Sequence, residues 1–175
     1  MKELTSTSFG YIIAFLLPGL LGLYALALWF TGINTLLEPA LSPQTTIGPS
    51  LFLLFCALTL GLLLSAMRHF IFERWLCESH KFAPNVFREL RKNENLVAFT
   101  AVVEQHYRYH QFYGGCAVAM FILFPRWMWN HWSELGCLKG WATIALFALF
   151  QAMIIETARD SFVKYVNRAN EIVAG

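Results

Sequence analysis

Residues 9–30 read FGYIIAFLLPGLLGLYALALWF and contain no charged side chain. Residues 47–67, which read IGPSLFLLFCALTLGLLLSAM, are also free of charge. A helix needs about 20 apolar residues to cross the hydrocarbon core of a bilayer, and both stretches reach that length. A helix also pairs its backbone groups internally, as a bilayer requires. We therefore expect both stretches to be membrane-spanning helices.

The composition of the whole chain agrees with this interpretation. The sequence is 57% hydrophobic and 14% charged, whereas about 25% of the residues in a soluble domain are charged. Two shorter apolar stretches, at 112–125 and 141–155, predict further spans if the aromatic and polar residues beside them lie at the interfaces. The third stretch could instead form a re-entrant or buried helix. The expected fold is an all-α, integral membrane four-helix protein with spans at about 9–30, 47–70, 112–131 and 139–156.

The remaining segments are expected to belong to this single membrane domain, residues 1–175. The segment at about 71–111 is too short to hold an independent core, so we interpret it as helical extensions of spans two and three. Residues 157–175 are predicted to form a tail. The connection at 31–46 contains Pro39 and Pro43 and is expected to be a coil.

The positions of the basic residues predict the orientation. Eleven of the 13 Lys and Arg residues lie at the N-terminus, in the middle segment or in the tail, and only Arg126 and Lys139 lie on the other side. Positively charged loops stay in the cytoplasm. Both termini and the segment 71–111 are therefore predicted to be cytoplasmic. The first apolar stretch is longer than a usual signal-peptide core, and we interpret it as the first span.

Small residues recur at intervals of four within the predicted spans. Such stripes let helices approach closely, which is the main association force in lipid. They predict either packing inside one chain or an interface between copies, and the pattern does not distinguish the two. The residues are Ala57, Gly61, Ser65, Gly115, Ala119, Ala148 and Ala152.

Ionisable residues are predicted to gather at the cytoplasmic surface of the membrane. Ionisable groups near hydrocarbon tend to pair with one another or to face a wet cavity. One interpretation is therefore a collar of interfacial salt bridges, and the other is a functional site. The residues are Arg68, His69, Glu73, Glu104, His106, Arg108, His110, Glu156, Arg159 and Asp160.

Some residues of this cluster are of types that could bind a metal ion. His69, Glu73, Cys77 and His80 fall on one helical face, and His106 and His110 lie one turn apart. These are residue types that zinc prefers, but their spacing matches no tight zinc motif. We expect no metal, no cofactor and no catalytic residue. Basic and acidic residues alternate in the middle segment, so no nucleic-acid partner is expected and attraction to anionic lipid is the simpler role.

Polar side chains are sparse within the spans. Gln151 is the residue that could line a pore, and such a pore would need several copies of the chain. Gln151 could equally form a hydrogen bond with a neighbouring helix.

Two blocks of sequence resemble those of a known class of proteins. Ser65–Glu73 reads SAMRHFIFE and Glu104–Tyr113 reads EQHYRYHQFY. Both are similar to segments of small bacterial multi-pass membrane proteins. Some proteins of this size and layout accompany anti-phage defence loci, including RNA-targeting CRISPR systems. The resemblance implies a bacterial inner-membrane location and a role as an effector or accessory protein.

These observations predict a non-enzymatic protein that lies in the lipid bilayer, forms homo-oligomers and alters membrane permeability on a cytoplasmic signal, in anti-phage defence. One alternative is a passive anchor that recruits a cytosolic protein partner. A second alternative is a metal-dependent enzyme at the membrane interface, built on His69, Glu73, His106 and His110.

Overall fold

The computed structural model describes residues 10, 12–42, 46–76, 82–84, 86–89, 96–97, 99–100, 104–134 and 138–174. All regular secondary structure in these residues is helical, as the sequence predicts. The elements are η1 (Ile12–Leu16), α2 (Leu17–Trp29), α3 (Thr31–Leu41), α4 (Ile47–Arg68), η2 (His69–Leu76), α5 (Val86–Glu89), α7 (Glu104–Asn130), η4 (Trp132–Glu134) and α8 (Leu138–Ala174).

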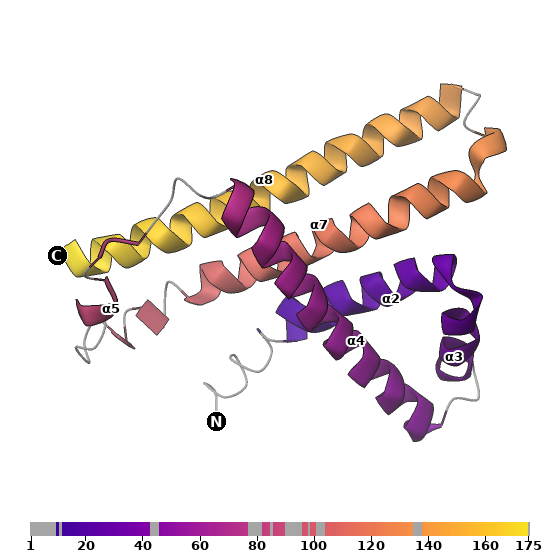
Figure 1. Ribbon diagram of the computed structural model, residues 1–175, viewed down its shortest axis with the longest axis horizontal. Coiled ribbons are helices and arrows are strands. Elements are labelled where there is room, and N and C mark those ends of the chain that lie inside the picture. The colour runs from indigo at the N-terminus through magenta and orange to yellow at the C-terminus, as the bar shows by residue number, and fades with distance from the viewer. Residues whose placement is uncertain are drawn as a thin grey trace.

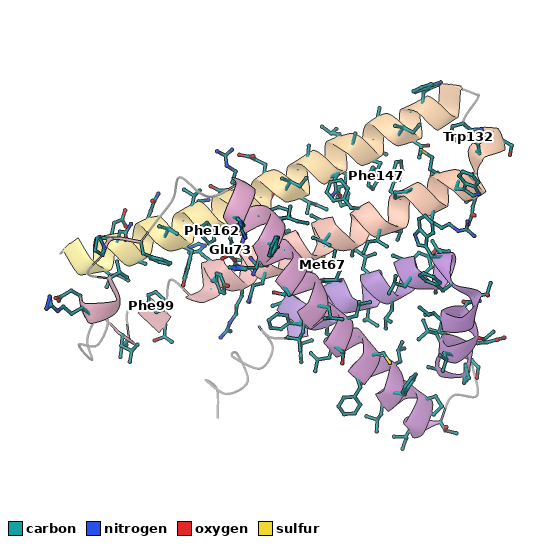
Figure 2. All side chains as sticks on the ribbon, in the orientation of Figure 1. Met67, Glu73, Phe99, Trp132, Phe147 and Phe162 are labelled. Atoms are coloured by element: carbon teal, nitrogen blue, oxygen red, sulfur yellow. The ribbon has the colours of Figure 1, made fainter. Side chains whose placement is uncertain are left out.

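Helices α7 and α8 form a long antiparallel hairpin (Figure 1). They contain 27 and 37 residues, which correspond to about 40 and 55 Å at 1.5 Å per residue. Phe147 of α8 points toward α7 (Figure 2), and its ring stacks on Phe124 with 3.5 Å between the ring centroids. Farther along, the core between the two helices contains Ala117, Val118 and Ala158.

Helix α2 lies beside α7, and α4 crosses both helices obliquely (Figure 1). Glycine makes the crossing of α2 and α4 possible. A Cβ atom on Gly19 would overlap the carbonyl oxygen of Ala57, and one on Gly61 would overlap the carbonyl oxygen of Phe15. The two backbones therefore touch directly, which is the close approach that small residues permit in lipid.

The connection between the first two apolar stretches is not a coil, contrary to the expectation from its prolines. Residues Thr31–Leu41 form helix α3, with Pro39 inside it. Ile33 and Leu37 lie four residues apart and pack against α2 and α4, and a repeating apolar face of this kind favours a helix. Helix α3 runs across the end of α2 and contacts α4 (Figure 1).

The residues predicted as a tail, from 157 onward, continue α8 without interruption to Ala174. Middle-segment residues pack on this extension of α8. Val86 and Ala169 form the centre of a small cluster with Phe82, Phe99 and other residues. The backbone N–H of Ala83 donates a hydrogen bond of 2.9 Å to the Asn170 side chain.

The helices place the connections and the basic segments at opposite ends of the molecule (Figure 1). We call the end that contains α3 and η4 the loop end. The end that contains η2, α5 and residues 159–174 is called the basic end. This separation is the one that the distribution of Lys and Arg predicts, although it does not by itself assign either end to a side of a membrane.

Three helices in the described part of the chain are long and apolar enough to cross a membrane: Ile12–Trp29, Ile47–Arg74 and Gly140–Ile172. They agree with the predicted spans one, two and four. Helix α7, which contains the predicted span at 112–131, is not among them, since Arg126 and several polar residues lower its hydropathy. The third predicted span, at 112–131, therefore stays a prediction.

Candidate functional site

The candidate site begins with an ion pair between Arg68 and Glu73. Arg68 Nη1 donates a hydrogen bond of 2.7 Å to Glu73 Oε1. In an α-helix, residues five apart point about 140° away from each other. From His69 the helix is a π-helix, in which backbone hydrogen bonds join residues five apart. The wider turn brings Glu73 onto the face of Arg68, and π-helical turns of this kind are frequent at functional sites.

The second oxygen of Glu73 is bound by His69. His69 Nδ1 lies 2.8 Å from Glu73 Oε2. The two residues differ in environment, because the side chain of His69 is 66% exposed and that of Glu73 is 17% exposed. His69 therefore connects the nearly buried carboxylate to the outside of the protein.

His110 reaches the same carboxylate from α7. Its Nδ1 lies 2.8 Å from the backbone oxygen of Ala158 in α8. A carbonyl oxygen only accepts hydrogen bonds, so Nδ1 must carry the hydrogen. Nε2 lies 3.6 Å from Glu73 Oε1, which is longer than a hydrogen bond. Nε2 of His110 therefore faces the carboxylate without forming a hydrogen bond to it.

The environment of His110 favours the uncharged form of the imidazole. The side chain is fully buried, and Phe162 of α8 packs on it with 4.9 Å between ring centroids. His110 lies outside the predicted span at 112–131. Burial lowers the pKa of its imidazole, and the nearby Arg68 lowers it further, while the contacts with Glu73 and Ala158 oppose these effects.

Arg68 is enclosed where η2 meets α7. Its side chain is 2% exposed, and its guanidinium carbon lies 5.7 Å from the centre of the Tyr107 ring. Gly114 makes room for it, because a Cβ atom there would lie 2.5 Å from Arg68 Cγ and Cδ. A buried charge without a partner costs several kcal/mol, so Glu73 is needed to keep Arg68 in this position.

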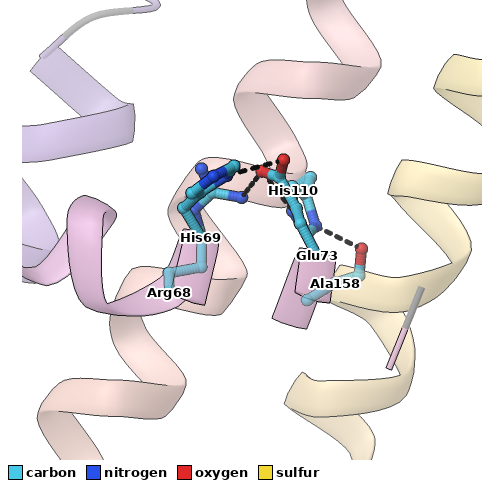
Figure 3. A network of polar contacts seen from close by, with 5 residues as sticks. All are labelled: Arg68, His69, Glu73, His110 and Ala158. Carbon is cyan, nitrogen blue, oxygen red and sulfur yellow. Dashed lines mark hydrogen bonds and ion pairs between the residues drawn. The ribbon is translucent and has the colours of Figure 1, made fainter. Parts of the chain in front are cut away.

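Together these contacts fasten three helices at the basic end. Figure 3 shows the arrangement, in which the α4–η2 helix supplies the ion pair, α7 supplies His110 and α8 supplies the backbone oxygen. We call Arg68, His69, Glu73, His110 and the Ala158 carbonyl the Glu73 network. Glu73 and Phe162, both labelled in Figure 2, each contact His110.

The predicted cluster residues of α8 form pairs of their own. Glu156 and Arg159 form an exposed pair on α8 with 3.6 Å between Oε2 and Nη1. Asp160 accepts a hydrogen bond of 2.6 Å from Lys164 on the same helix. Of the ten residues predicted as one collar, four therefore belong to the Glu73 network and three belong to exposed pairs on α8.

His106 lies near charged residues of α8, and Arg108 lies beside Gly10. The pKa of His106 is lowered by partial burial and by the nearby Arg168 and Lys164, and Asp160 opposes this effect. Arg108 is half-buried, and its side chain occupies the space beside Gly10. The side chain of Glu104 lies outside the described part of the structure.

The structure also places the small residues that the sequence singles out. Ala57, Gly61, Gly115 and Ala119 are buried and Ser65 is half-buried, all within the single chain. Their neighbours include η1 and α2, since a Cβ atom on Gly115 would lie 3.1 Å from Pro18. The remaining two, Ala148 and Ala152, are exposed on α8. They are thus available for contact with lipid or with a second molecule.

Gln151 is 4% exposed and lies between α7 and α8. Its side-chain nitrogen donates a hydrogen bond of 2.9 Å to the backbone oxygen of Ala117. In the single chain it therefore joins two helices, which is one of the two roles considered for it.

In the described part of the chain, no three His, Cys, Asp or Glu side chains are grouped closely enough to hold a metal ion. Glu73 contacts His69 and His110, whereas His106 faces charged residues of α8. Cys77 and His80 lie outside the described residues.

Several parts of the network were not predicted from the sequence. The Ala158 carbonyl is a backbone group, which has no signature in the sequence. The packing of Tyr107 and Gly114 against Arg68 depends on how the helices meet. Phe162 did leave a usable pattern, since Ala158, Phe162 and Val166 follow one another at intervals of four and predict a helical face.

Comparison of the chain with protein-family models, with curated protein sequences and with solved structures gives no match.

Proposed function

We propose that the chain is a bacterial inner-membrane protein with four spans and both termini in the cytoplasm. In this proposal it self-associates and alters the permeability of the bilayer when a cytoplasmic signal releases the Glu73 network. The Lys and Arg distribution favours the orientation. The three apolar helices favour insertion.

The observation that carries this proposal is the burial of the Arg68–Glu73 pair where α7 and α8 meet η2. Removing one partner of a buried ion pair leaves an uncompensated charge and costs about 3–5 kcal/mol. Any event that draws Glu73 away therefore destabilises the present contact of the three helices. His69 offers a route for such an event, because it is exposed and bonded directly to Glu73. A local change of charge would then bias the packing of the spans.

Self-association is supported by the outward faces of the helices. Large apolar side chains on α8 are exposed, among them Leu146, Leu149 and Met153, and Ala148 and Ala152 lie beside them. A permeation path through one chain is not favoured, since Gln151 is engaged in a hydrogen bond to Ala117. Several copies would be needed to enclose a path.

The assignment to anti-phage defence rests on the resemblance of Ser65–Glu73 and Glu104–Tyr113 to small membrane proteins near defence loci. In this proposal the permeability change is part of a response to phage infection.

The experiment compares dye release from liposomes that contain the wild-type chain, Glu73→Gln or Glu156→Gln. Gln at position 73 keeps the shape of the side chain and removes the charge that holds Arg68. We expect Glu73→Gln to release dye at least several-fold faster than the wild type. The Glu156→Gln control removes a charge from an exposed pair and should match the wild type. Dye retention by a folded, inserted Glu73→Gln protein would contradict the proposal.

A passive anchor for a cytosolic partner is the second candidate. Leu96 and Val97 lie outside the predicted spans and are 48% and 69% exposed, and an exposed apolar pair in water suits a protein contact. This alternative predicts intact liposomes with Glu73→Gln. It also predicts a soluble protein that co-purifies with the wild type and is lost with Leu96→Ser and Val97→Ser.

A further inference from the structure

Helices α2, α3 and α4 enclose an apolar cavity of about 370 Å³ at the loop end. Its walls include Leu20 and Leu23 of α2, Leu37 of α3 and Leu53 of α4. Cavities that bind small molecules have volumes of about 300–1,000 Å³ and are mostly apolar with a few polar groups. The size and lining of this cavity are therefore those of a ligand site.

The position of the cavity indicates a ligand from the bilayer. The walls formed by α2 and α4 belong to two of the helices that are able to cross a membrane. Helix α3 runs across the end of α2 (Figure 1) and closes the cavity on one side. A hydrocarbon chain could enter between the helices without leaving the apolar phase, whereas a polar solute would have to cross it.

Two polar side chains in the lining are available for a head group. Tyr24 is 58% exposed and Asn34 is also exposed. Neither side chain forms a hydrogen bond with the described part of the chain, although both line the cavity. A phenol and an amide offer donors and acceptors without charge, so they suit an amphiphile whose polar part sits at the mouth of the cavity.

The charges nearby favour a head group that carries a cation. Glu38 follows Asn34 by one helical turn and is exposed, and residues 31–46 contain no Lys or Arg. The guanidinium of Arg126 is engaged by other groups, since its Nε donates a hydrogen bond of 2.9 Å to the Leu28 backbone oxygen and its Cζ lies 5.6 Å from the centre of the Trp29 ring. A carboxylate near the mouth repels an anionic head group and attracts an ammonium group.

From these observations we infer that the cavity binds one phospholipid with a zwitterionic, ammonium-bearing head group. One acyl chain fills the space between α2, α3 and α4, the head group meets Tyr24 and Asn34, and the ammonium lies toward Glu38. This inference requires that the chain inserts into a bilayer, but it is independent of any permeability change.

Native mass spectrometry of the full chain tests the acyl-chain site. The protein is transferred from nanodiscs that contain equal amounts of phosphatidylethanolamine and phosphatidylglycerol. We expect the wild type to retain one phosphatidylethanolamine. Ala27→Phe puts a ring into the cavity and should reduce this retention at least five-fold. Ala145→Phe is the matched control, because Ala145 is exposed on α8, and it should retain lipid like the wild type. Equal retention by Ala27→Phe and Ala145→Phe would overturn the site.

The head group is tested with Glu38→Lys in the same lipid mixture. Reversal of the charge should shift the retained lipid toward phosphatidylglycerol, while the number of retained lipids stays at one. An unchanged preference for phosphatidylethanolamine, or a wild type that prefers phosphatidylglycerol, would overturn the head-group assignment. Circular dichroism of each variant checks that the helices are intact. Because liposome leakage plays no part in this measurement, its result is separate from that of the proposed permeability function.

Discussion

Arg68 and Glu73 are five residues apart in the sequence, yet Arg68 Nη1 and Glu73 Oε1 lie 2.7 Å apart. They meet because the helix changes from α to π at His69. A continuous α-helix would have directed the two side chains to different faces. The π-helical segment thus brings Arg68 and Glu73 into contact, and the resulting ion pair lies where this helix packs against α7 and α8.

Loss of the Glu73 charge should destabilise the folded chain. We expect Glu73→Gln to lower the free energy of unfolding by about 3–5 kcal/mol, because Arg68 is left buried and unpaired. Glu156→Gln, in an exposed pair, should change it by no more than about 1 kcal/mol. Thermal unfolding in detergent, followed by circular dichroism, measures both variants. Equal unfolding temperatures for the two variants would show that the Arg68–Glu73 pair does not hold the helices.

Removal of both charges should be less harmful than removal of one. Replacing a buried ion pair by apolar residues is often neutral or stabilising. We therefore expect Arg68→Met combined with Glu73→Met to unfold at a higher temperature than Glu73→Gln. A double variant that is less stable than Glu73→Gln would mean that the two side chains contribute independently, which their direct hydrogen bond does not predict.

Gly114 should tolerate no side chain. A Cβ atom at this position would press on Arg68 Cγ and Cδ, and Arg68 is held in place by Glu73. Gly114→Ala is expected to destabilise the protein by about 1–3 kcal/mol, as overpacking usually does. Gly32→Ala is the control, since nothing lies within 4 Å of a Cβ atom there and alanine is the better helix former, by up to about 1 kcal/mol. Opposite shifts in the unfolding temperature are the expected result.

Stability should fall as the pH falls below 6.5. The pKa values of His106 and His110 are both lowered from their usual value of 6.5 in the folded chain. Between 6.5 and the lowered values the unfolded chain binds more protons than the folded chain, so acid favours unfolding. Unfolding temperatures between pH 5 and 8 measure this dependence. His106→Gln and His110→Asn should each flatten it, and an unchanged slope in both would contradict the assignment.

Gln151 gives a separate test of helix packing. Gln151→Leu removes the hydrogen bond to the Ala117 backbone oxygen, and hydrogen bonds between membrane helices contribute about 0.6 kcal/mol on average. We expect a small loss of stability in detergent and no change in the rate of dye release caused by Glu73→Gln. A large change in that rate would instead support Gln151 as a residue that lines a pore.

The sequence predicts the apolar helices well, because an uncharged stretch such as 47–67 has one stable form in lipid. It does not predict α3, since the prolines in the connection favour a coil, whereas the spacing of Ile33 and Leu37 favours a helix. The sequence predicts a tail beyond Glu156 because the hydropathy falls there. It leaves open that α8 continues through this segment to Ala174.

The candidate site could be predicted in composition but not in arrangement. Arg68, Glu73 and His110 were all expected at one end of the molecule, because ionisable residues cluster where spans leave the membrane. These three residues meet because of the π-helical turn after Arg68 and because Gly114 leaves room for the Arg68 side chain. The residue types alone predict neither the turn nor this contact.

The central claim is that the apolar helices cross a bilayer and that the Glu73 network faces the cytoplasm. Single cysteines in a cysteine-free background test it most directly, at exposed positions of the loop end (Thr35, Ser133) and of the basic end (Arg88, Asn167). A membrane-impermeant maleimide should label the first pair in intact cells and the second pair only after lysis. Labelling of Arg88→Cys and Asn167→Cys in intact cells would contradict the claim.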